Sequence, residues 1–181
     1  MISAAQIHRE RTKQCGMKKD ELVECLLIVE GDPVNLNMFD HEFRSTPGPV
    51  WHDRKSDGVP KYSFHGLAPV PKSIQRRGFD TAGKLWCKDH WGLEADLEQM
   101  QIKRRPHLRC YRFFTCGTPK KELIWHAVNR HSMLRVVHVI ASRMDARMYE
   151  HHYADGRYSH TTISHDLDRF EAIRAEAGFV V

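Results

Sequence analysis

Short hydrophobic runs follow one another along the chain and are separated by glycine, proline and charged residues. The first run, residues 21–30, is apolar at most positions, which predicts a central strand covered on both faces. Residues 107–116 are predicted to form a strand, and the β-branched residues in 134–141 favour a buried one. Further extended segments are predicted over residues 62–67, 97–103, 146–154 and 157–163.

Helices are predicted where a capping residue precedes apolar side chains at helical spacing. Asp32 followed by Pro33 marks the start of one such helix, which is predicted to end near residue 44. Its expected apolar face is formed by Val34, Met38, Phe39 and Phe43. Other helical segments are predicted as a turn ending at residue 77 and over residues 80–92, 119–131 and 164–177.

The order of these elements predicts the fold class. Helices separate strands that are not neighbours, whereas Asp155 and Gly156 predict a tight hairpin between the last two strands. We therefore expect an α+β fold with a mainly antiparallel sheet, helices packed on one face, a long loop insertion at residues 45–61 and a C-terminal helix. The predicted organisation is a basic N-terminal arm, residues 1–20, and a single domain over residues 21–181.

Several motifs occur in the order found in the YubB-type ferredoxin-like family of phage and plasmid proteins. They are a strand, glycine and helix at residues 26–39 (LLIVEGDPVNLNMF), a Pro-x-Pro piece at residues 69–71, a tryptophan helix ending in WCKDHWGLEAD at residues 86–96, FFTCGTP at residues 113–119, and the Asp155–Gly156 hairpin. The chain resembles this family over residues 22–160. It departs from the family at His90, where asparagine is usual, and at residues 93–95, where Thr-Lys-Trp is usual.

The resemblance implies a ferredoxin-like α+β fold and an origin in a phage or other mobile element. The role of the family is poorly known, so no catalytic residue is transferred to this chain. The absence of familiar catalytic motifs, taken with the implied origin, favours a non-enzymatic protein that binds a host protein or defence complex. An anti-CRISPR-like inhibitor is the concrete form of this hypothesis. A cofactor is not expected.

The amino-acid composition indicates which binding partners and which cellular compartment to expect. The net charge is +5 and the pI is about 9.0, so an acidic protein surface or a nucleic acid is a plausible partner. The 5 cysteines form no Cys-x-x-Cys pair, which favours reduced thiols and a location in the cytoplasm of a bacterial host. No apolar run is long enough to span a membrane, so no membrane association is expected.

The partner-binding residues that we expect are basic or aromatic side chains in loops and turns. An exposed tryptophan in the loop would be a contact anchor, whereas a tryptophan folded onto the core would be structural. The candidates are Trp51, His52 and Arg54 in the insertion and Arg104 and Arg105 in a basic turn.

The alternative hypothesis is RNA or single-stranded DNA binding through a sheet face that combines cations with aromatic rings. Its candidate residues are Arg109, Tyr111 and Phe113 on one strand and Arg147, Tyr149 and His151 on another. These side chains would instead form the core if that face lies beneath the helices.

A third hypothesis is an enzyme that uses metal or histidine chemistry. Cys87 and His90 have a spacing that suits two metal ligands on a helix, although no further pair of ligands is fixed by the sequence. General acid–base chemistry would use His138, His151 or His160.

Overall fold

The computed structural model describes residues 22–44, 48–56, 58–59, 61–142, 146–164 and 167–179. It contains one six-stranded sheet in the order β2-β3-β1-β4-β5-β6, and every pairing between neighbouring strands is antiparallel. The strands are β1 Val23–Glu30, β2 Glu98–Arg105, β3 Leu108–Thr115, β4 Arg135–Ser142, β5 Arg147–Ala154 and β6 Arg157–Ser164. The predicted α+β class and antiparallel sheet are confirmed, while the predicted N-terminal arm lies outside the described residues.

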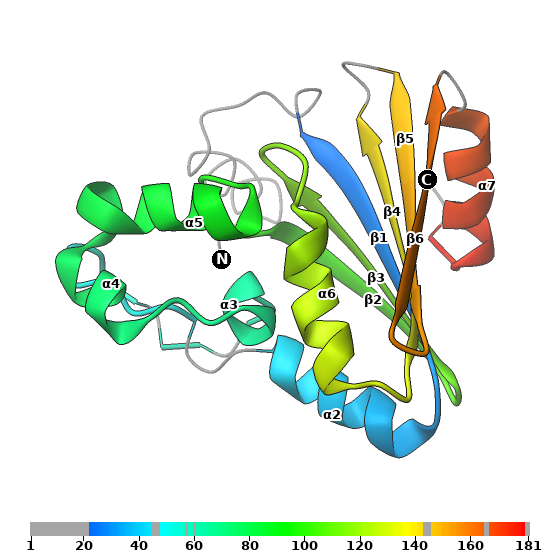
Figure 1. The fold of residues 1–181 in the computed structure, drawn as a ribbon, viewed down its shortest axis with the longest axis horizontal. Coiled ribbons are helices and arrows are strands. Elements are labelled where there is room, and N and C mark those ends of the chain that lie inside the picture. Colours follow the sequence, from blue (N-terminus) through cyan, green and yellow to red (C-terminus); the bar gives the residue numbers. More distant parts are fainter. Residues whose placement is uncertain are drawn as a thin grey trace, which may run out of the picture.

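The helices lie on both faces of this sheet rather than on one, which corrects the sequence prediction. They are α2 Pro33–Phe43, α3 Phe64–Leu67, α4 Lys72–Arg77, the π-helix Phe79–Gly83, α5 Lys84–Trp91, α6 Lys121–Arg130 and α7 Leu167–Glu176. Figure 1 shows α6 and α7 on opposite sides of the sheet. None of the helices described is long and apolar enough to cross a membrane.

Strand β1 explains why both faces are covered. Cys25, Leu27 and Val29 belong to the main core, which α2 and α6 cover. Leu26 is fully buried in a second core with Phe170 of α7, and Ile28 packs against that core. The continuous apolar run of β1 therefore reflects two cores, as expected for a strand with both faces buried.

Two local predictions differ from the structure. Residues 62–67 are not extended, because the Ser63 side chain accepts a hydrogen bond from the amide of His65 and begins the short helix α3. In α2 the buried residues are Leu36, Phe39 and Phe43, whereas Val34 and Met38 are 68% and 56% exposed.

His138 lies fully buried in β4, and neither ring nitrogen has a hydrogen-bond partner among the described residues. Burial first, and then the neighbouring His151, lower the pKa of His138 to about 3. A neutral imidazole still carries one N–H donor and one acceptor, so this ring is an unsatisfied polar group in the core.

Replacing His138 with leucine should raise the free energy of unfolding by about 1–3 kcal/mol near neutral pH, because it removes an unsatisfied polar ring. Below the ordinary histidine pKa, unfolded His138 binds a proton while the folded ring stays neutral until the pH approaches 3. The free energy of unfolding of the wild type therefore decreases as the pH falls between these two pKa values of His138. The variant has no imidazole at this position and does not show this decrease.

Urea unfolding at about pH 7.5 and about pH 5 measures both effects, and the advantage of His138→Leu should be about 2 kcal/mol larger at the lower pH. The exposed His41 provides the control, since the difference in stability between His41→Leu and the wild type should not increase comparably at the lower pH. An advantage of equal size at both pH values would contradict the burial argument.

Candidate binding site in the inserted lobe

The chain between α2 and β2 forms a lobe beside the sheet, defined here as the described residues from 48 to 96. It contains α3, α4, the π-helix and α5, and it lies on the same side of the sheet as α6 (Figure 1). Within the lobe, the indole N–H of Trp91 donates to the carbonyl of Ala68 at 3.1 Å, and its ring lies 5.9 Å from that of Phe64. Trp91 and Phe64 both belong to the main core and so attach the lobe to it. Phe64 in turn contacts Phe113 of β3, with ring centroids 5.7 Å apart.

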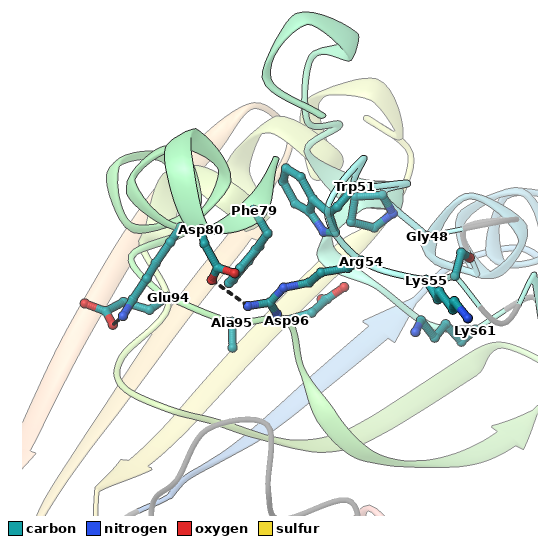
Figure 2. Close-up of a pocket in the computed structure, with 13 residues that line it drawn as sticks. Gly48, Trp51, Arg54, Lys55, Lys61, Phe79, Asp80, Glu94, Ala95 and Asp96 are labelled. Atoms are coloured by element: carbon teal, nitrogen blue, oxygen red, sulfur yellow. Dashed lines mark hydrogen bonds and ion pairs between the residues drawn. The ribbon is translucent and has the colours of Figure 1, made fainter. Parts of the chain in front are cut away.

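A pocket of about 360 Å³ opens in this lobe, and Figure 2 shows the side chains that line it. The rings of Trp51 and Phe79 meet edge to face in its wall, with centroids 5.2 Å apart. The guanidinium of Arg54 lies 3.7 Å from the centroid of Phe79 and forms an ion pair of 2.8 Å with Asp80. Stacking on a ring and pairing with a carboxylate both favour a fixed guanidinium.

Asp53 holds the loop that carries Trp51 and Arg54. Its carboxylate accepts hydrogen bonds from the amides of Phe79, at 2.8 Å, and Asp80, at 3.1 Å, and so caps the start of the π-helix. These backbone donors lower the pKa of Asp53, the amide of Phe79 most strongly. Asp53 therefore holds its loop against the start of the π-helix.

Gly83 allows Trp51 to pack closely against the lobe. A Cβ atom on Gly83 would lie 2.5 Å from the six-membered ring of Trp51, which is far closer than van der Waals contact. The absence of a side chain at this position therefore permits the close approach of the indole.

Asp96 lies at the inner end of the pocket and joins three parts of the lobe. Its carboxylate accepts hydrogen bonds from the amides of Phe64 and Leu97, both at 2.9 Å, and from the hydroxyl of Ser63. Burial raises the pKa of Asp96, although these donors and Lys61 act in the opposite direction. Because its oxygens are already bonded, we assign Asp96 a structural role.

The charges around the lobe pocket are only partly neutralised. Lys84 and Lys88 both pair with Glu94, at 2.9 Å and 3.1 Å. Lys55 and Lys61 also line the pocket, and neither forms a hydrogen bond or ion pair with another described residue. The site therefore offers ammonium groups without a hydrogen-bonded partner beside two aromatic rings, although Lys61 also acts on the Asp96 carboxylate. This lining suits an anionic group on a partly apolar ligand.

The predicted partner-binding residues do not form a single cluster. Trp51 and Arg54 line the pocket, and His52 is exposed on the same loop. Arg104 instead pairs with Asp40 at 3.2 Å and donates to the hydroxyl of Tyr62, while Arg105 donates to the carbonyl of Glu176. Arg104 and Arg105 therefore connect β2 to neighbouring segments of the chain.

Half of the predicted nucleic-acid face is buried, which is a correction. Tyr111 and Phe113 have no exposed surface, and Arg109 is 8% exposed and donates to the side chain of Asn37. These residues point beneath α2 and α6, because alternate residues of β3 face the main core.

The other half of that face lies on β5 and remains accessible. Arg147 is exposed, and Tyr149 and His151 are partly buried. His151 lies opposite His138 of β4 and His160 of β6, with ring centroids 6.1 Å and 6.2 Å away. Burial first, and then neighbouring charges, lower the pKa of His151.

Cys87 and His90 are not arranged as the metal ligands that their spacing in the sequence suggests. Cys87 is buried, which raises the pKa of its thiol to about 12, and His90 is exposed and stacks on Trp86 at 4.1 Å. Among the described residues, no group of three or more histidine, cysteine or acidic side chains is placed to hold a metal ion. Cys25, Cys87 and Cys110 are free thiols, but Cys116 is disulfide-bonded, so the expectation of a fully reduced set is wrong for Cys116.

Asp96→Ala should lower the free energy of unfolding by about 1–3 kcal/mol, because it leaves the amides of Phe64 and Leu97 without an acceptor. Asp96→Asn should retain most of the stability, since its carbonyl oxygen still accepts hydrogen bonds and no charge is buried. Urea unfolding near pH 7 compares the two variants. Equal losses would show that the charge of Asp96, and not its acceptor oxygens, supports the lobe.

Gly83→Ala should displace Trp51 and deform the pocket without changing any charge. The measurement is the quenching of tryptophan fluorescence by acrylamide, in which the contribution of Trp51 is the part that a Trp51→Phe background lacks. Ala82→Ser is the neighbouring control at a buried position of the same helix. Unchanged quenching in Gly83→Ala would contradict the close packing.

The comparisons with known proteins concern the fold alone. No family model and no curated protein matches the chain. The structure is similar to the crystal structure of a protein api92 from Yersinia pseudotuberculosis, described with the family model DUF1281, at a TM-score of 0.62 and 7% sequence identity. The similarity covers 79% of this chain and 97% of that chain. The two proteins thus share an α+β architecture, and the resemblance to the YubB-type family stays a prediction.

Proposed function

We propose that this protein is a non-enzymatic binding protein and that its lobe pocket takes an acidic side chain of a protein partner. The observation that carries the proposal is that Lys55 and Lys61, neither of which forms an ion pair with another described residue, line the pocket together with the Trp51 and Phe79 rings. A carboxylate is the protein group that such ammonium groups attract most strongly.

The lining favours a protein over a nucleic acid. Asp80, Glu94 and Asp96 line the same pocket as the cations, so a chain of phosphates would meet carboxylates as well as ammonium groups. Binding to a nucleic-acid backbone depends on many like-signed contacts along a track, whereas this pocket is small and of mixed charge. A peptide that presents one acidic and one apolar side chain fits this lining better.

The residue types in the pocket are those that dominate protein interfaces. Tryptophan and arginine are enriched among the few interface side chains that supply most of the binding energy. Asp80 and Phe79 position Arg54, and Trp51 packs closely against Gly83, so both side chains lose less entropy on binding than unsupported side chains would. The half-buried indole also leaves apolar surface for a partner.

Beyond the α+β class, we also propose a ferredoxin-like fold and a mobile-element origin. Strands β1 to β4 with α2 and α6 follow the order strand, helix, strand, strand, helix, strand, and they lie in the order β2-β3-β1-β4. This arrangement supports a ferredoxin-like unit to which β5, β6 and α7 are added. The sequence resemblance supports a phage or mobile-element protein whose partner is a host protein, such as a defence complex in the cytoplasm.

Trp51→Ala and Arg54→Ala should each weaken capture of a protein partner from nuclease-treated host lysate at least tenfold, because truncating an interface anchor costs about 2 kcal/mol or more. Arg76→Ala is the matched control, since Arg76 is exposed on α4 and does not line the pocket. Quantitative mass spectrometry of the captured proteins identifies the partner and measures the losses. Equal capture by all variants would move the contact surface away from the lobe.

Carbodiimide coupling tests the acidic character of the partner, because it joins a lysine amine to a carboxylate in direct contact. Lys55 and Lys61 should couple to aspartate or glutamate residues of the captured partner. Lys55→Arg and Lys61→Arg should retain binding and lose their coupling, whereas Lys72→Arg should change neither. Capture without any coupling at these lysines would contradict an acidic side chain in the pocket.

A second candidate is RNA or single-stranded DNA binding on β5 and β6. It is favoured by the accessible Arg147 beside Tyr149 and His151, which combine a cation with rings on one sheet face. Recovery that disappears after nuclease treatment and weakens in Arg147→Ala would support this candidate over the first.

A further inference from the structure

The sheet ends in two edge strands that differ in how they are protected. Among the described residues, β2 and β6 each pair with a single strand, β3 and β5 respectively. The free edge of a strand presents unpaired backbone amides and carbonyls, and proteins commonly block such edges with charges or with local distortions. A long edge without these features is suited to pairing with another strand.

Strand β2 carries both kinds of protection. Its register with β3 shifts between Glu98 and Gln101, and Gln99 has a positive φ of 54°. Toward its end lie three consecutive cations, Lys103, Arg104 and Arg105. Continuous pairing of another strand along β2 would therefore meet a distorted backbone and a cluster of charge.

Strand β6 has neither kind of protection in its centre. Each of its 8 residues is in register with β5 without a shift. Its one formally charged residue, Arg157, lies at the end next to the hairpin. The central residues are exposed and include Thr161 and Thr162, which are β-branched and favour strands.

We propose that β6 pairs antiparallel with β6 of a second copy of this chain, so that two sheets join into one across a twofold axis. The hairpin determines which groups are available. Asp155 and Gly156 have φ values of 51° and 67°, as in a two-residue turn that closes on a hydrogen-bonded pair, here Ala154 and Arg157. Hydrogen-bonded and non-bonded pairs then alternate, so the amides of Tyr158, His160 and Thr162 point away from β5.

The sequence of β6 is complementary to itself in a register that uses these amides. In an antiparallel pair, residues whose backbone amides point toward the partner strand lie opposite one another. A twofold axis at Thr161 meets this condition, because it places His160 opposite Thr162 of the second copy. The two Thr161 side chains then face each other, and threonine pairs across strands are favourable. No two formal charges of like sign lie opposite in this register, which favours a second copy as the occupant.

The helices leave this edge open in the described structure. α7 follows β6 but packs against β4 and β5, with Phe170 and Ala177 in the second core. In Figure 1, α7 lies beside the face of the sheet, and β6 is its last strand. Pairing at β6 would therefore extend the sheet without displacing α7, and it would leave the two lobe pockets free.

Light scattering after size exclusion, with the full chain over a range of concentrations, tests the proposal. The wild type should show a dimer of about twice the 21.1 kDa chain mass. Thr161→Lys, which places two ammonium groups opposite each other, should raise the dissociation constant at least tenfold. Thr162→Pro removes an amide that points outward and should have a similar effect, while Thr161→Val should remain dimeric.

Circular dichroism establishes that each variant is folded, and a variant that is unfolded is replaced by Thr162→Lys. A wild type that is monomeric at all concentrations would overturn the proposal, even if a peptide were then found to bind the edge. A dimer that Thr161→Lys and Thr162→Pro leave intact would also overturn it, because its interface would lie elsewhere. Loss of the dimer in both variants, with retention in Thr161→Val, would support pairing through β6.

Discussion

The burial of β1 on both of its faces is the constraint on which the rest of the structure depends. Odd-numbered residues such as Leu27 require a cover on the side of α2 and α6, and Leu26 requires one on the side of α7. Each fully buried leucine contributes roughly 1.5–3 kcal/mol relative to exposure, so neither face can be left open. The sheet order follows, since β1 lies between β3 and β4 and has no free edge.

The lobe shows how a binding surface can be held firmly outside the sheet. Phe64 and Trp91 enter the main core, and the carboxylate of Asp96 bonds to the amide at the start of α3. Trp51 lies at the margin of the main core, against which its partly buried ring packs, and Arg54 is exposed. The part of the pocket that faces solvent is thus separate from β1, as a binding site on a stable scaffold requires.

Much of the fold could be predicted from local patterns, because those patterns act over a few residues. The Asp32–Pro33 start of α2 and the Asp155–Gly156 turn follow from backbone geometry alone, and both are confirmed. The predicted apolar face of α2 is confirmed at Phe39 and Phe43 but wrong at Val34 and Met38, because the direction of this face depends on what packs beneath it. Burial of Tyr111 and Phe113 depends in the same way on which sheet face the helices cover.

The lobe pocket could be predicted only in part for a related reason. Trp51 and Arg54 stood out by residue type, whereas Asp53, Phe79 and Asp96 have no distinguishing local sequence. Their roles arise from contacts between segments that are distant in the chain, such as Asp53 with Phe79. Charge patterns in the sequence likewise do not reveal that Asp80 neutralises Arg54 while Lys55 stays unpaired.

Helix α7 lies beyond residues 22–160, for which the YubB-type resemblance is predicted, but it is also needed to cover β1. Glu24 of β1 is 3% exposed and pairs with Arg112 of β3 at 2.5 Å and with Arg174 of α7 at 3.5 Å. Removing one partner of such a buried group leaves a charge without compensation, so the three side chains are needed together. A buried carboxylate on the central strand therefore requires the cation that α7 supplies. Because Arg174 and Phe170 approach β1 from the same side, the ion pair and the second core place α7 against the sheet in one position.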